Sequence, residues 1–157
     1  MSCITWNENP SSPFQTSISF GLTIMIICQI FGGVSGAHLN PAVTIAAYVY
    51  KMVDIKLALM YIIAQLMGSL IGYGLLVGIA PTQFLKSYDD STGIGLCMTM
   101  PLNDLSIWQS VVIEFLATSV LIFVNCGVWE PKNCIYGDSV ALRIGLTVAA
   151  LSIAIVS

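Results

Sequence analysis

The near absence of charge over long stretches is the feature that most constrains this chain. No Asp, Glu, Lys or Arg occurs between Glu8 and Lys51, or between Lys56 and Lys86. Charged residues make up 8% of the sequence, whereas a soluble domain carries about 25%. Because so few charges cannot cover a soluble surface, the sequence predicts an integral membrane protein with a single domain.

Apolar segments long enough to cross a bilayer occur four times. A spanning helix needs about 20 apolar residues. We expect such helices at residues 16–34, 57–80, 107–128 and 139–157, with loops at 81–106 and 129–138. The predicted fold class is therefore an all-α membrane protein.

The basic residues indicate an orientation in the membrane. Four of the five flank one set of connections: Lys51, Lys56, Lys132 and Arg143. Because cytoplasmic loops are enriched in Lys and Arg, these connections are predicted to face the cytoplasm. The N-terminal segment and the 81–106 connection then face outward, where a disulfide between Cys3 and Cys97 is one open possibility.

Little in the sequence points to catalysis, a metal or nucleic acid. There is one His, and the five Cys form no CxxC motif, so we expect no metal site and no cofactor. No pair of acids lies within one span, which leaves no catalytic set. The basic residues are few and scattered, so nucleic acid is not an expected partner.

The stretch SGAHLNPAVT, residues 35–44, interrupts the first charge-free run. Asn is a preferred helix N-cap and Pro is favoured at the first helical position, so Asn40-Pro41 predicts a helix start. A helix over residues 41–50 would be about 15 Å long, half the thickness of the hydrocarbon core. We therefore expect a re-entrant half-helix. The alternative is one long helix kinked at Pro41, which Gly32, Gly33 and Gly36 disfavour.

A helix that starts at membrane depth has chemical consequences. Irregular backbone there is tolerated only inside protein or beside a water-filled cavity, so we expect residues 35–38 to be extended with accessible carbonyl groups. The positive partial charge at the helix N-terminus repels cations. The carboxamide oxygen of Asn40 can cap the helix while its N–H groups face a permeant oxygen.

SGAHLNPAVT closely resembles the first pore loop of the aquaporin (major intrinsic protein) family, and the chain is similar to insect-type members. SFGLTIMIICQIFGG, YIIAQLMGSLIGYGLL, VVIEFLATSVLIFV and IGLTVAALSIAIV look like the family's helices two to five. The resemblance implies a right-handed helical bundle. Complete members have six spanning helices and two half-helices. Residues 1–157 would then form a partial channel domain with the first NPA loop at 35–50, and we expect a fragment or a truncated product.

The resemblance also implies roles for individual residues in the pore loop. Asn40, Pro41 and Ala42 match the pore motif. The backbone carbonyls of Gly36, Ala37 and His38 would line the permeation path, and the side chain of His38 would be structural.

Two further positions resemble the family's selectivity filter. Phe20 matches its aromatic residue on helix two, although an ordinary packing or lipid-facing Phe is the alternative. Ser152 lies where water-selective members carry His. Because members with a small residue there tend to pass larger uncharged solutes, glycerol and urea become candidate solutes.

Glu114 resembles the buried acid that holds a pore loop from helix four. A structural role is therefore expected for Glu114. The alternative is a proton relay, which is weakly supported because its span contains no second ionisable group of that kind.

These interpretations predict a passive channel for water, with small uncharged solutes as further candidates. A non-conducting subunit that associates with complete channels is the alternative. The expected partners are the lipid bilayer, water, neutral solutes and, by resemblance, three further copies in a homotetramer. The plasma membrane is the expected location.

Overall fold

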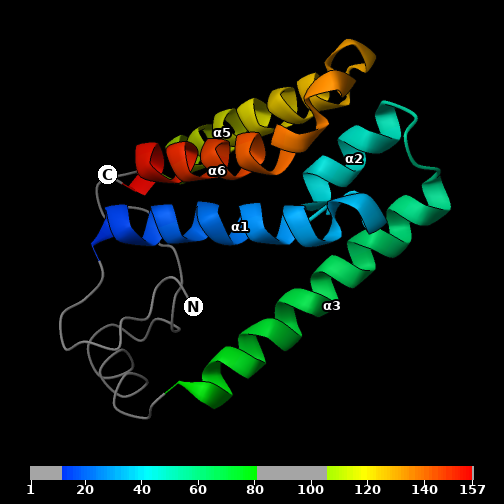
Figure 1. Cartoon of the computed structure of the whole chain (residues 1–157). Helices are drawn as coiled ribbons and strands as arrows, with labels where there is room; N and C mark the ends of the chain where they lie inside the picture. Colours follow the sequence, from blue (N-terminus) through cyan, green and yellow to red (C-terminus); the bar gives the residue numbers. More distant parts are fainter. Residues whose placement is uncertain (1–11, 81–105, 157) are drawn as a thin grey trace.

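The computed structural model describes residues 12–80 and 106–156, and within these ranges every regular element is a helix (Figure 1). In chain order the elements are α1 (Pro13–Ser35), α2 (Pro41–Val49), α3 (Ile55–Ile79), α5 (Ile107–Trp129), the 3₁₀ helix η1 (Pro131–Ser139) and α6 (Val140–Val156). Cys3 and Cys97, the pair considered for a disulfide, lie outside the described residues.

The four predicted spans are confirmed as long apolar helices. Helices α1, α3 and α5 and the segment Gly137–Ile155, which covers α6 except for its last residue, are long and apolar enough to cross a membrane. Side-chain caps mark the starts of α1 and α3. The Ser12 hydroxyl accepts from the Gln15 N–H at 3.2 Å, and the Asp54 carboxylate accepts from the Leu57 N–H at 3.1 Å. Both helices therefore start slightly before the apolar segments expected at 16 and 57.

The prediction of a loop at 129–138 was wrong. Helix α5 continues to Trp129, and η1 then leads directly into α6. Pro131 occupies the start of η1, and the Asn133 side chain donates to the Gly127 carbonyl at 2.6 Å. This bond folds the polar segment back onto the end of α5 and makes a tight helical turn.

Helices α1 and α6 form the main packed pair and run antiparallel along each other (Figure 1). Their small buried residues lie along one seam, namely Ser17, Gly21 and Cys28 on α1 and Ala141, Gly145 and Ala149 on α6. Small residues let two membrane helices approach closely. Helix α5 packs on α6, so these three helices form one bundle.

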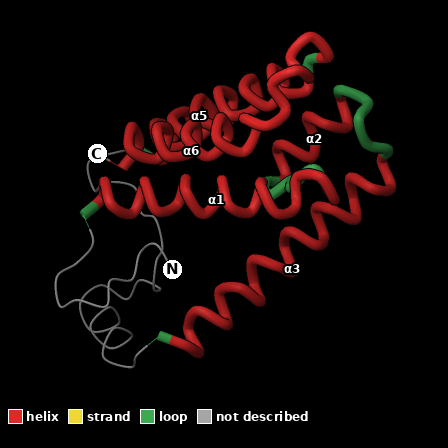
Figure 2. The backbone as a smooth tube through the Cα atoms, viewed as in Figure 1, coloured by secondary structure: helices red, strands yellow, loops and turns green. Residues whose placement is uncertain are grey.

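The short helix α2 lies beside α5 and connects the bundle to α3. Figure 2 shows α3 running obliquely away from the other long helices, and Ala58 is its one buried residue. The turn between α2 and α3 lies at the same end of the molecule as η1 (Figure 1). The two connections with the basic residues thus share one side, as the predicted orientation requires.

Candidate functional site

The connection between α1 and α2 is compact rather than extended. Gly36 and Ala37 have φ values of 72° and 49°, in the left-handed region. The Gly36 N–H donates to the Gly32 carbonyl at 3.0 Å and ends α1. The expectation that residues 35–38 are extended was therefore wrong, because a left-handed helix cap reverses the chain more tightly. Asn40, which follows these residues, has extended backbone, with φ −129° and ψ 129°.

Asn40 begins α2, as the sequence indicates. Its side-chain oxygen accepts from the Ala42 N–H at 2.9 Å, and its backbone carbonyl accepts from the Thr44 N–H at 3.1 Å. Pro41 occupies the first turn, where no N–H donor is needed. Helices α1 and α2 are separate elements, so a single long helix kinked at Pro41 is excluded. The cap uses the carboxamide oxygen of Asn40 and leaves its N–H groups for another partner.

Two side chains of α3 hold this connection in place. The Tyr61 hydroxyl donates to the Ser35 carbonyl at 3.0 Å. The Gln65 amide donates to the His38 carbonyl and, at 2.9 Å, to the Thr44 hydroxyl. Gln65 thus joins the loop to the first turns of α2. Sequence reasoning missed both residues, although a Gln inside a charge-free span was a usable signal, because polar groups at membrane depth require partners.

The His38 ring is enclosed by aromatic side chains. Its centroid lies 5.4 Å from that of Tyr61, edge to face, and 6.0 Å from that of Trp129. Its Nδ1 atom is buried without a hydrogen-bond partner among the described residues. These contacts agree with a structural side chain.

The two candidate filter residues lie on the two helices that pack most closely. The Ser152 hydroxyl donates to the Ser17 hydroxyl at 3.0 Å. Ser17 precedes Phe20 by three residues, so Ser152 is brought to the turn of α1 that carries Phe20. The Phe20 side chain is 47% exposed and is free to border a path or lipid.

Glu114 does not occupy a buried position in the described chain. Its side chain on α5 is exposed, because α2, η1 and α6, which pack on α5, leave it uncovered. Both the burial of Glu114 and its contact with a pore loop therefore stay predictions.

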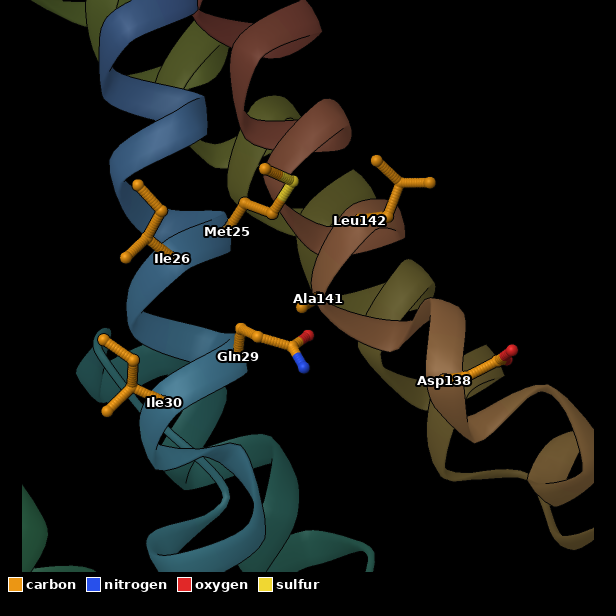
Figure 3. A pocket seen from close by; sticks show the side chains of 7 residues that line it. All are labelled: Met25, Ile26, Gln29, Ile30, Asp138, Ala141 and Leu142. Carbon is orange, nitrogen blue, oxygen red and sulfur yellow. The ribbon is translucent and has the colours of Figure 1, made fainter.

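A cavity of about 230 Å³ lies between α1 and α6, outside the predicted site. It is lined by Met25, Ile26, Gln29, Ile30, Asp138, Ala141 and Leu142. Figure 3 shows the Gln29 side chain pointing toward α6 and the Asp138 carboxylate pointing away from α1. None of the predicted site residues lines this cavity. Over residues 12–80 and 106–156, no group of His, Cys, Asp and Glu is placed to hold a metal ion.

Four long apolar helices and a short helix that starts between them define an integral, multi-pass membrane protein. The sequence matches the family described as major intrinsic protein over residues 2–157. The chain therefore belongs to the major intrinsic protein family, which consists of channels and not enzymes.

Curated relatives support this assignment. Aquaporin-4 of Mus musculus and of Homo sapiens are each 34% identical over 152 residues, covering 94% of this chain and 45% of theirs. Aquaporin-5 of Sus scrofa is 32% identical over 147 residues, covering 94% of this chain and 52% of its own. The chain thus spans about half the length of the relatives it matches.

Proposed function

We propose that these residues belong to a passive channel for water, driven by osmotic gradients. The observation that carries the proposal is the start of α2 at Asn40, fixed from α3 by Gln65. A helix N-terminus carries positive partial charge, which opposes the entry of cations and protons. The Asn40 N–H groups, left over by the cap, are suitable donors for a passing water oxygen.

The carbonyl groups of the loop supply the acceptors in this proposal. In this proposal the backbone oxygens of Gly36, Ala37 and His38, which precede Asn40 in the chain, face the permeation path. The His38 carbonyl already accepts from Gln65, and a carbonyl oxygen has two lone pairs, so it can accept a second hydrogen bond. A water molecule would donate hydrogen bonds to the loop carbonyls and then accept one from the Asn40 amide. It would pass without any change in covalent bonding.

Small uncharged solutes such as glycerol or urea extend this proposal. Ser152 offers a small hydroxyl where an imidazole would take more room, and Phe20 supplies an apolar wall. A wider, partly apolar filter favours molecules with a carbon backbone as well as hydroxyl groups. The Ser152 contact with Ser17 supports a position beside the α1 turn that carries Phe20.

The proposed setting is the plasma membrane, with the α2–α3 turn and η1 on the cytoplasmic side and four copies in a homotetramer. The basic residues of these two connections support the orientation.

The partial channel domain covers residues 1–157, with the pore loop at 35–50. Pro41 and Ala42 pack at the start of α2 and complete the pore motif.

A second candidate is a non-conducting subunit that associates with full-length channels. The exposed surface of α3 favours it, since Ala58 is the one buried residue of that helix. Co-expression of the tagged chain with a full-length relative, followed by pull-down and swelling measurements, tests this candidate. Absence of association would remove it.

The decisive experiment for the channel is osmotic permeability. The complete coding sequence that contains these residues is expressed and reconstituted in liposomes, and shrinkage is followed by light scattering after an osmotic step. We expect faster shrinkage than in protein-free liposomes, without proton leakage. Permeability equal to that of protein-free liposomes, with correctly folded protein present, would overturn the proposal.

A further inference from the structure

Ser17 and Ser152 form an unusual contact for hydroxyl groups on apolar helices. Several helical hydroxyls here donate to the carbonyl four residues earlier, as Thr23 does to Ser19 at 2.8 Å and Thr147 to Arg143 at 2.8 Å. Ser152 donates instead across the interface to Ser17, at 3.0 Å. Ser17 is 1% exposed, so the accepting hydroxyl is shielded from solvent. The orientation of the Ser152 hydroxyl is therefore set by another helix.

Close packing of α1 and α6 does not depend on this pair of hydroxyls. A Cβ atom added to Gly21 would lie 2.5 Å from the Ala149 Cβ atom, and one added to Gly145 would lie 2.5 Å from the Met25 Cβ atom. The two glycines thus fix the approach of the helices within one or two turns of Ser17. The hydroxyl pair is free to serve a different role.

We propose that Ser17 is a positioning residue for solute selectivity, acting through Ser152. This inference rests on the proposed place of Ser152 in the filter. By accepting the Ser152 proton, Ser17 leaves the Ser152 oxygen as a fixed acceptor. A fixed acceptor suits solutes that donate hydrogen bonds from several groups, such as polyols and urea. Without Ser17, the Ser152 hydroxyl turns to the Val148 carbonyl in its own helix.

The test measures glycerol and water permeability of the reconstituted channel for four proteins: wild type, Ser17→Ala, Ser152→Ala and the double variant. Ser17→Ala is expected to lower the glycerol-to-water permeability ratio by about fivefold, the effect of one ordinary hydrogen bond. In the Ser152→Ala background, Ser17→Ala should change nothing further, because the two residues act as one unit. An equal loss in both backgrounds, or an unchanged ratio in the single variant, would overturn the proposal.

The matched control is Ser19→Ala, which removes a hydroxyl from the same turn of α1, because the Ser152 hydroxyl donates to Ser17 and not to Ser19. We expect it to leave the ratio at the wild-type value. A similar fall of the glycerol-to-water permeability ratio in Ser19→Ala would show a general effect of altering α1. That result would count against a specific role for Ser17.

Cysteine cross-linking separates this proposal from the proposed function. Ser17→Cys paired with Ser152→Cys should form a disulfide in membranes on mild oxidation, and Ser19→Cys paired with Ser152→Cys should not. Efficient cross-linking with no glycerol flux in the wild type would overturn the assignment of Ser152 to a solute filter, and with it the selectivity role. Failure to cross-link would overturn the Ser17 contact alone.

Discussion

Gly21 of α1 faces Ala149 of α6 so closely that a Cβ atom on the glycine would lie 2.5 Å from the Ala149 Cβ atom and 2.6 Å from the Gly145 carbonyl oxygen. No rotamer change can relieve a clash with backbone. This contact makes α1 and α6 a rigid pair, and both candidate filter residues belong to it.

Replacing Gly21 by Ala is therefore expected to destabilise the protein. Overpacking of a tight contact costs about 1–3 kcal/mol, which should lower the midpoint of thermal unfolding in detergent, measured by intrinsic fluorescence. Gly68→Ala on α3 is the control, because a Cβ atom there meets nothing within 4 Å. Its midpoint should stay the same or rise slightly, since Ala favours helix by about 1 kcal/mol over Gly. Equal unfolding midpoints for Gly21→Ala and Gly68→Ala would contradict the tight contact at Gly21.

Asn40 combines a cap and a proposed contact with water, and two variants can separate these roles. Ala at position 40 removes the cap and should lower stability by about 1 kcal/mol. Ser retains a capping oxygen without the amide N–H groups, so Asn40→Ser should keep the unfolding midpoint and still lower osmotic water permeability. Thermal unfolding and light scattering on the same preparations provide both readouts. Full permeability in the Ser variant would show that Asn40 serves only as a cap.

Gln65 is expected to be essential for the shape of the pore loop. Gln65→Leu keeps the volume but removes the donor to the His38 carbonyl and the Thr44 hydroxyl. Leaving buried polar groups unpaired costs about 1–3 kcal/mol, and water permeability should fall together with the unfolding midpoint. Ser69→Ala serves as control, because the Ser69 hydroxyl donates within α3 to the Leu66 carbonyl at 2.8 Å and makes no hydrogen bond to the pore loop among residues 12–80 and 106–156. Wild-type permeability in Gln65→Leu would contradict a positioning role.

Ser152→His tests the size of the proposed filter. An imidazole is larger than a hydroxymethyl group and carries a ring N–H, so glycerol permeability should fall more than water permeability. Light scattering after glycerol and sucrose gradients measures the two quantities. If glycerol permeability and water permeability both stayed at the wild-type values, Ser152 would not belong to the filter.

The helices could be predicted because their signals are local. Uninterrupted apolar runs of about 20 residues indicate spans, and Asn40-Pro41 carries its own start signal. The prediction at 129–138 failed because this polar segment forms a 3₁₀ helix, which the Asn133 side chain ties to the Gly127 carbonyl. Composition cannot reveal a contact of that kind.

The details of the site depended on contacts between distant parts of the chain. Left-handed backbone at Ala37 was unexpected for a residue with a Cβ atom, and it is held in place where Tyr61 and Gln65 bind the flanking carbonyls. Sequence periodicity cannot identify partners that are 26 or 27 residues apart. Family resemblance indicated Ser152 but gave no indication that its hydroxyl would bond to Ser17.

The hydrogen bonds from Tyr61 and Gln65 also impose an order on biosynthesis. A nascent chain is made from its N-terminus, so the loop after α1 leaves the ribosome before the helix that binds it. Until α3 enters the membrane, the Ser35 and His38 carbonyls lack their partners. The half-helix therefore reaches its final place only after the insertion machinery has delivered α3, and substitutions at Gln65 should lengthen the time for which the early intermediate is open to quality-control proteases.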